Sequence, residues 1–129
     1  MDKKNIKVLI VDDEADFRKL MKFWFGAKGY IVIEAPDGKS ALKAVKDSNP
    51  DVIFMDLMMP VMDGLEAIKR IRRFNKGVPI IVISSYVNDL KVKKMMSYDI
   101  SGIFYKGKDF REGLTLLETA LRTHKKLKK

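Results

Sequence analysis

Acidic, hydroxyl and ammonium side chains follow four apolar runs of this chain. VLIV precedes Asp12 and Asp13, DVIFM precedes Asp56, IIVI precedes Ser84, and GIFY precedes Lys106. If each run is a buried parallel strand, these side chains emerge together at the carboxyl edge of one sheet, where open α/β folds bind ligands. Three carboxylates and a lysine at that edge would hold a divalent cation and a phosphoryl group.

These residue types suit phosphoryl chemistry assisted by a metal ion. Mg²⁺ prefers oxygen ligands, and Asp12, Asp13 and Asp56 can supply carboxylates. A carboxylate beside a metal can also attack phosphorus and form an aspartyl phosphate. The ammonium of Lys106 would neutralise one phosphoryl oxygen, and the hydroxyl of Ser84 would donate a hydrogen bond to another. Taken singly, an acidic pair can merely cap a helix and a strand-end Asp can be structural, so the prediction depends on the four strand ends together.

Strand and helix patterns alternate along the whole chain. Runs of buried-type residues predict strands, and apolar residues three and four apart predict amphipathic helices. The predicted strands cover 6–11, 30–34, 51–56, 80–84 and 102–106, and a predicted helix follows each strand, the last two near 88–97 and 109–124. This alternation predicts an α/β fold with a five-stranded parallel sheet, doubly wound as (βα)5.

The first predicted helix is rich in aromatic residues. Its apolar spacing places Phe17, Leu20, Met21 and Trp24 on the buried stripe and leaves Phe23 partly exposed. We interpret this group as core packing rather than a binding surface. The methionines of the 55–62 segment are likewise expected to fill gaps in the core and loop rather than to bind metal.

Composition limits the class of protein. The chain has 129 residues, 47% of them hydrophobic, so we expect one domain over 1–129 with a Lys-rich tail over 125–129. There is no cysteine, no apolar stretch near the roughly 20 residues that span a bilayer and no signal peptide, so we expect a soluble cytoplasmic protein. The net charge of +9 is concentrated in 91–129, which holds 11 Lys or Arg against 4 Asp or Glu. This excess suggests an acidic partner, although a solvated basic tail explains 124–129 equally well.

Four motifs resemble one family, the receiver domain of two-component response regulators, and in particular the chemotaxis receivers. They are VLIVDDE at 8–14, AxDGxxAL at 35–42, DLMMPVMDG at 56–64 and PIIVISS at 79–85, followed by Lys106. The resemblance implies a flavodoxin-like three-layer sandwich over essentially the whole chain. It also implies a signalling domain rather than an enzyme, one that catalyses only its own phosphorylation and dephosphorylation.

The resemblance assigns a role to each candidate residue. Asp56 would accept a phosphoryl group from a histidine kinase or a phosphorelay protein. Asp13 and Asp56 would bind Mg²⁺ directly, Asp12 would act through water, and the backbone carbonyl of Met58 would complete the protein's ligands. Ser84 would sense the phosphate, and Lys106 would bind it.

The resemblance also implies an output surface on the fourth helix, fifth strand and fifth helix. We expect this surface to bind an acidic protein, and the chain to be a monomer or a dimer that forms on phosphorylation. The alternative is a solvated charged surface. The basic candidates are Lys91, Lys93, Lys94, Lys108 and Arg111.

Two positions depart from the family pattern, and two variable positions flank the site. Receivers usually carry an aromatic residue three positions before the lysine, where this chain has Ile103, and a proline after it, where this chain has Gly107. By strand alternation, Tyr105 lies on the same face as Ile103 but nearer the site. Met58 and Tyr86 flank the site and are bulky without being bases, so we expect slow hydrolysis of the aspartyl phosphate.

Two other functions compete with the receiver interpretation. A Mg²⁺-dependent phosphatase with an aspartyl nucleophile, of the haloacid dehalogenase type, would place a DxD arrangement after its first strand, where this chain has adjacent Asp12 and Asp13. A basic nucleic-acid-binding module is permitted by the charge, but the sequence has no helix-turn-helix pair, zinc ligands or aromatic β-platform, so we expect no direct nucleic-acid binding.

Overall fold

Five parallel strands form a single sheet. The computed structural model describes residues 5–85 and 90–123, with only the backbone for residues 90 and 91. The strands are β1 (Lys7–Val11), β2 (Ile31–Ala35), β3 (Val52–Asp56), β4 (Ile80–Ser84) and β5 (Gly102–Tyr105), in the order β2-β1-β3-β4-β5. β3 and β4 are buried along their whole length, which explains why their sequences are continuous apolar runs rather than alternating ones. All five predicted strands are confirmed.

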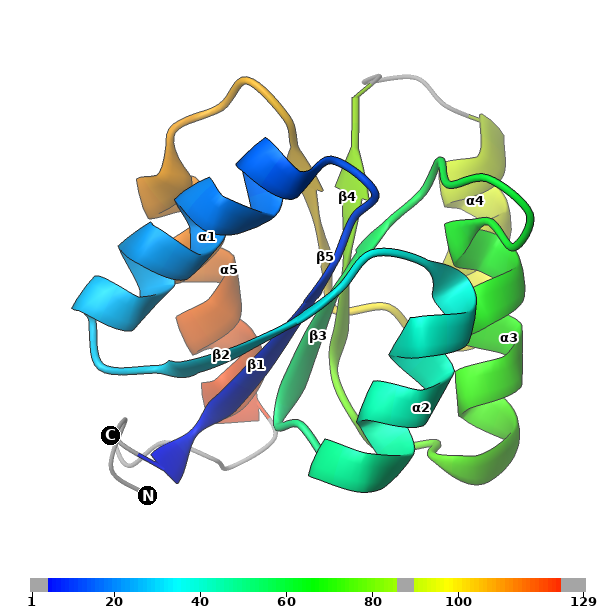
Figure 1. Cartoon of the computed structure of the whole chain (residues 1–129). Coiled ribbons are helices and arrows are strands. Elements are labelled where there is room, and N and C mark those ends of the chain that lie inside the picture. The colour runs from blue at the N-terminus through cyan, green and yellow to red at the C-terminus, as the bar shows by residue number, and fades with distance from the viewer. Residues whose placement is uncertain (1–4, 86–89, 124–129) are drawn as a thin grey trace.

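Helices cover both faces of this sheet, as Figure 1 shows. The helices α1 (Ala15–Ala27) and α5 (Phe110–Thr123) lie on one face. The helices α2 (Gly38–Ser48), α3 (Gly64–Phe74) and α4 (Leu90–Met95) lie on the other face, and α4 continues into the 3-10 helix η2 (Met96–Tyr98). Each face buries its own apolar core, so the three-layer α/β prediction is confirmed. The predicted start of the fourth helix, near Asn88, lies outside the described residues.

The predicted buried face of α1 is wrong at two positions. Leu20 and Trp24 are 50% and 38% exposed, whereas Met21 and Phe25 are completely buried. Trp24 lies at the margin of the core, where its indole stacks on Phe110 of α5 with ring centroids 6.0 Å apart. The helix therefore faces the sheet with the positions four apart that include Met21 and Phe25. Phe23 is 68% exposed, as predicted.

The methionines of the 55–62 segment divide between core and surface. Met55 and Met59 are buried and pack in the core under α2, α3 and α4, with Met62 partly buried beside them, as predicted. Met58 is 51% exposed. This residue belongs to the loop that follows β3, next to the carboxyl edge of the sheet.

The strand order places a ligand crevice between β1 and β3. Chain connections leave β1 for one edge of the sheet, through β2, and proceed from β3 to the other edge, through β4 and β5. Open α/β sheets bind ligands outside the carboxyl ends of the strands at such a switch point. Val11 of β1 pairs with Met55 of β3, so the next residues, Asp12 and Asp56, emerge there side by side.

Candidate functional site

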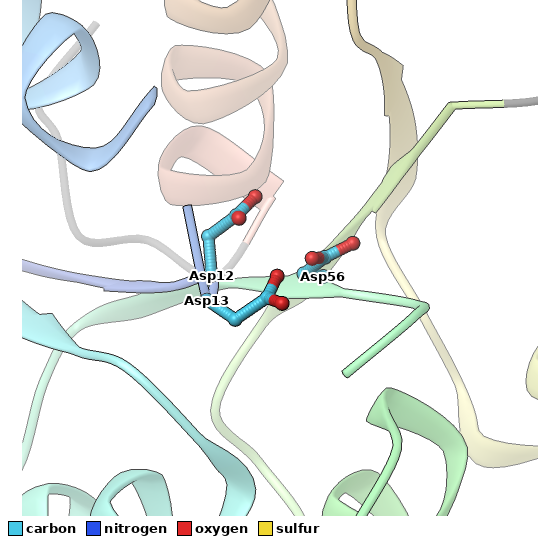
Figure 2. A group of neighbouring side chains, drawn as sticks. All are labelled: Asp12, Asp13 and Asp56. Carbon is cyan, nitrogen blue, oxygen red and sulfur yellow. The ribbon is translucent and has the colours of Figure 1, made fainter. Parts of the chain in front are cut away.

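Three carboxylates meet at the crevice between β1 and β3. Asp12 and Asp13 follow β1, and Asp56 is the last residue of β3. One carboxylate oxygen of each lies within 4.8 Å of the others (Figure 2). Asp12 and Asp56 are buried, whereas Asp13 is exposed. The predicted acidic cluster therefore exists, with one carboxylate open to solvent.

The protonation of Asp56 reflects this crowding. Burial raises the pKa of its carboxyl from 3.8 to about 7, and the charge of Asp12 adds to the rise. The Lys106 charge and the Met58 backbone N–H, which donates to Asp56 Oδ1 at 3.3 Å, oppose it. Like charges held together in a buried site are stabilised by a divalent cation, and carboxylate oxygens are the ligands that Mg²⁺ prefers. The residues present therefore fit a bound Mg²⁺.

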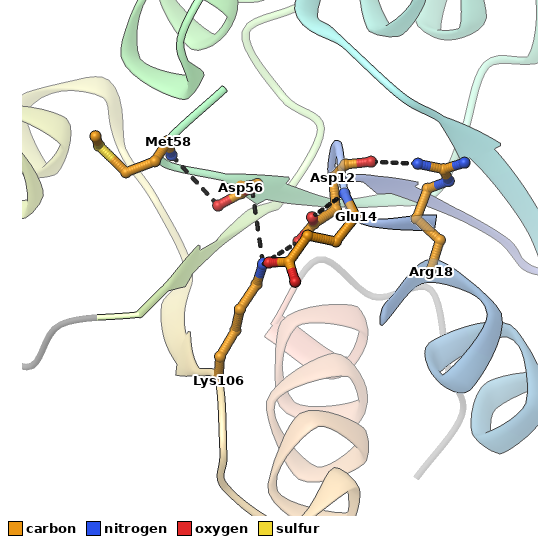
Figure 3. Close-up of polar contacts among 6 residues, drawn as sticks. All are labelled: Asp12, Glu14, Arg18, Asp56, Met58 and Lys106. Atoms are coloured by element: carbon orange, nitrogen blue, oxygen red, sulfur yellow. Dashed lines mark hydrogen bonds and ion pairs between the residues drawn. The ribbon is translucent and has the colours of Figure 1, made fainter. Parts of the chain in front are cut away.

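The ammonium of Lys106 lies among the acidic residues, as Figure 3 shows. Its Nζ is 2.9 Å from Asp12 Oδ2 and 3.8 Å from Asp56 Oδ2, and it also forms an ion pair with Glu14. The same Nζ is 4.7 Å from the centre of the Phe17 ring. Burial alone would lower the pKa of Lys106, but hydrogen bonds to Glu14 and Asp12 and the charge of Asp56 raise it above its usual value. Lys106 is therefore held as a cation beside the buried carboxylates.

Ser84 ends β4 on the other side of Asp56. Asp56 pairs with Ile83, so Ser84 lies one residue further toward the crevice, and it is buried. The partner of Ser84 in β5 is Tyr105, whereas Ile103 pairs with Val82, further from the strand end. Residues paired in parallel strands direct their side chains to the same face. Tyr105 is thus the aromatic residue paired with Ser84, and it lies nearer the strand end than Ile103, as strand alternation predicted.

A glycine, a sharp turn and a helix cap shape the loop after Asp56. A Cβ on Gly64 would lie 2.2 Å from the backbone oxygen of Asp56, so only glycine allows α3 to begin so close to the end of β3. The chain turns sharply at Val61, which has φ +67°, and the N–H of Met62 donates to Pro60 O at 2.8 Å. Asp63 then caps α3 by accepting a hydrogen bond from the Glu66 N–H at 3.0 Å. The loop is therefore fixed at both ends.

Sequence reasoning missed two residues of the site. Glu14 reaches Lys106, which is 92 positions away, and Arg18 donates from Nη1 to the backbone oxygen of Asp12 at 2.6 Å. Arg18 also pairs with Glu34 through Nε at 3.2 Å. Glu14 is the third acidic residue of VLIVDDE, and its place beside Asp12 and Asp13 was the one sequence signal that could have identified it. Arg18 has no signal in the sequence, because its contact depends on how α1 leaves β1.

The predicted basic output residues are arranged unevenly. Lys93, Lys94 and Lys108 are exposed. The guanidinium of Arg111 is held by Asp109, with Nη2 2.6 Å from Oδ2, so much of its charge is neutralised locally. The Lys91 side chain and the whole of Tyr86 lie outside the described residues.

Residues 8–118 match the model of the response regulator receiver domain family. The chain belongs to that family. A receiver domain is a signalling module, and the match favours signalling over the phosphatase and nucleic-acid alternatives. Among curated relatives, this receiver is similar to the alkaline phosphatase synthesis transcriptional regulatory protein PhoP of Bacillus subtilis, with 34% identity over 82% of this chain and 43% of PhoP. It is also similar to regulatory protein AtoC of Escherichia coli, with 38% identity over 62% of this chain and 17% of AtoC.

Solved receiver structures have the same fold. The chemotaxis protein CheY4 of Vibrio cholerae has a TM-score of 0.85 and 30% identity, covering 90% of this chain and 98% of CheY4. TrrA of Thermotoga maritima, solved with Mg²⁺ and BeF, has a TM-score of 0.82 and 29% identity, covering 90% of this chain and 99% of TrrA. The chain spans less than half the length of the curated relatives it matches. Among the described residues, no helix is long and apolar enough to cross a membrane.

Proposed function

We propose that this receiver domain accepts a phosphoryl group on Asp56. The observation that carries the proposal is the buried carboxylate of Asp56 at the switch point of the sheet, with Asp12 and Asp13 beside it and the ammonium of Lys106 3.8 Å away. The burial that raises the pKa of Asp56 also keeps bulk water from one side of the nucleophile. Family membership of residues 8–118 supports the same assignment.

The metal in this proposal is Mg²⁺. Asp13 and Asp56 would bind it directly, Asp12 through water, and Met58 through its backbone carbonyl. When bound, Mg²⁺ supplies positive charge that offsets the negative charge of the phosphoryl oxygens. The exposure of Asp13 supports this arrangement, because an exposed carboxylate leaves room for the waters that Mg²⁺ usually retains.

Lys106 and Ser84 would then bind the phosphoryl oxygens. The ammonium of Lys106 forms ion pairs with Asp12, Glu14 and Asp56. Because its Nζ is 3.8 Å from Asp56 Oδ2, it would reach an oxygen of a phosphoryl group on Asp56 after a small movement. The hydroxyl of Ser84 would donate to a second oxygen. When Ser84 moves toward the phosphoryl group, Tyr105, which is paired with Ser84, would transmit this movement to β5. Tyr105 would thus replace the aromatic residue that receivers usually carry at the position of Ile103.

The partners in this proposal are proteins. A histidine kinase or a phosphotransfer protein would supply the phosphoryl group in the cytoplasm. The α4, β5 and α5 surface, with exposed Lys93 and Lys108, would bind an acidic output protein. The receiver would be either a monomer or a dimer that forms on phosphorylation. The bulky side chain at Met58 would slow hydrolysis of the aspartyl phosphate.

The test is phosphorylation by a small donor. Wild-type protein, incubated with acetyl phosphate and Mg²⁺, should gain the mass of one phosphoryl group, and chelation of Mg²⁺ should prevent the gain. Asp56→Asn should show no gain, and Asp13→Asn a much smaller one. As a matched control, Asp47→Asn changes an exposed carboxylate of α2 and should be phosphorylated like wild type. An undiminished mass gain in Asp56→Asn would refute the assignment.

A further inference from the structure

A groove runs along α3 and α4, from the loop that follows Asp56 to the C-terminal end of α3. Three adjoining hollows of about 420, 250 and 430 Å³ make it, and each shares lining side chains with the next. Lys69 of α3 lines all three hollows. We call it the α3–α4 groove, and its principal lining residues are Met58, Val61, Leu65, Lys69, Lys94 and Tyr98.

The end of the α3–α4 groove nearest Asp56 exposes apolar side chains, which lie beside the carboxylates of Asp63 and Glu66. Met58 is 51% exposed, and Val61 is fully exposed although both are large apolar residues. Leu65 continues this apolar wall along the first turn of α3. Methionine adapts its shape to many apolar partners, so this end suits an apolar side chain of a partner. Val61 has a positive φ of 67°, and its side chain faces solvent.

The other end of the groove is basic. Lys69 and Lys94 line this end together with Tyr98, and the exposed Arg73 and Lys76 extend the same wall. Among the described residues, the side chains lining this end include no acid. A cluster of one charge sign in a hollow attracts and orients a partner of the opposite sign.

Arg72 makes the basic end rigid instead of contributing a free charge. Its guanidinium donates to the backbone oxygens of Tyr98 at 3.0 Å, Val78 at 2.7 Å, and Asn75 and Asp99 at 3.2 Å. These bonds tie the end of α3 to η2 and to the segment before β5. The floor of the groove is therefore preformed, which lowers the entropic cost of binding.

We propose that the α3–α4 groove binds an acidic segment of a partner protein, with an apolar residue of that segment against Met58 and Val61. The carboxylates of Asp63 and Glu66 line the apolar end, so they would repel acidic groups there and fix the direction of the segment. The same carboxylates and the apolar wall disfavour nucleic acid, whose phosphates carry charge along its whole length. A second copy of this chain is disfavoured by the net charge of +9 on each.

The experiment measures peptide binding to the full, unphosphorylated chain. The probe is a fluorescein-labelled peptide with a pair of leucines followed by a run of glutamates, measured by fluorescence anisotropy at low salt. Lys69→Glu combined with Lys94→Glu should weaken binding by at least about tenfold. The control variant combines Lys19→Glu in α1 with Lys28→Glu just after α1, on the opposite face of the sheet. It changes the net charge by the same amount and should weaken peptide binding less than about threefold.

Two further measurements separate the proposal from simple charge attraction. Val61→Asn, which tolerates the positive φ, should weaken binding of the leucine peptide but not of a peptide with serines in place of the leucines. Amide shifts in NMR spectra should move around Lys69 and Tyr98 rather than around Lys108. Equal loss in the two charge-reversal pairs, shifts confined to the Lys108 region, absence of binding, or tighter binding of a thymidine oligonucleotide would each overturn the proposal. Mass gain with acetyl phosphate in every variant checks that the fold is intact.

Discussion

The carboxylate of Asp56 is destabilised in the folded protein. Its pKa is raised to about 7, so the folded protein retains this proton to near neutral pH, while the unfolded chain releases it near 3.8. The contribution of Asp56 to stability therefore decreases as pH rises from about 4 to about 7, and the full cost is present above pH 7. Crowded carboxylates at such a site impose this cost whenever the compensating cation is absent.

Replacement of Asp56 by a neutral isostere tests this cost. At pH 8 with a chelator present, Asp56→Asn should raise the free energy of unfolding by about 1–3 kcal/mol, and at pH 4 the gain should be close to zero. Urea denaturation at both pH values measures it. Asp47→Asn, on the exposed face of α2, should change little at either pH. A gain at pH 8 that persists unchanged at pH 4 would contradict the electrostatic explanation.

Tyr105 occupies the position through which Ser84 can act on β5. Because Tyr105 pairs with Ser84 and Ile103 pairs with Val82, removal of the Tyr105 ring should uncouple the site from α5. Tyr105→Ala should still gain phosphoryl mass, yet lose at least about half of the phosphorylation-induced amide shifts in α5. Ile103→Ala should keep them. If Tyr105→Ala kept all of the phosphorylation-induced amide shifts in α5, or if only Ile103→Ala lost them, Tyr105 would not be the residue that couples the site to α5.

At the scale of single residues, the sequence predicted which site residues lie at strand ends better than it predicted which side chains contact one another. Asp12, Asp56, Ser84 and Lys106 end or follow buried strands, and parallel pairing brings such ends together without further information. The Glu14 to Lys106 pair was not predictable in this way. Glu14 lies outside the strands, so its direction depends on the geometry of the turn into α1.

The junction of β3 with α3 depends on one glycine. A methyl group on Gly64 would lie 2.2 Å from the backbone oxygen of Asp56, and no flexible side chain can move to relieve that contact. Gly64→Ala should therefore lower the free energy of unfolding by at least about 2 kcal/mol and reduce phosphorylation of Asp56. Urea denaturation and mass gain with acetyl phosphate measure the two effects.

Gly26 provides the matched control for this prediction. A methyl group at Gly26 in α1 meets nothing within 4 Å, so Gly26→Ala should stabilise the protein by about 0.5–1 kcal/mol through helix propensity alone. If Gly64→Ala were as harmless as Gly26→Ala, the tight approach of α3 to β3 would not be essential.

Helices and strands were predictable where the apolar pattern of their sequence had only one structural interpretation. β3 and β4 are short apolar runs between turn residues, and their bounds agree with the predictions to within one residue. In α1, apolar residues occupy nearly every side from Leu20 to Phe25, so periodicity could not decide which side packs on the sheet. In the structure the side with Met21 and Phe25 packs on the sheet, and Trp24 stacks on Phe110 of α5 at the margin of the core.

At the scale of the whole molecule, positive charge is in excess on a small domain. The net charge is +9 over 129 residues, and long-range repulsion among like charges opposes the compact state. Surface ion pairs such as that of Lys43 with Asp47 are exposed and contribute little against this repulsion. Screening by salt should therefore relieve more repulsion than it removes attraction.

The melting temperature should thus increase with salt, by about 3 °C or more between roughly 20 and 500 mM NaCl. Lys19→Gln combined with Lys28→Gln lowers the net charge by two and should flatten this dependence, because less repulsion is left to screen. Asp47→Asn raises the net charge by one and should steepen it. Calorimetry at pH 7, with a chelator present to exclude metal binding, measures all three. A melting temperature that decreases with salt would mean that local ion pairs outweigh the repulsion, and the excess of lysine would then be a feature for partners alone.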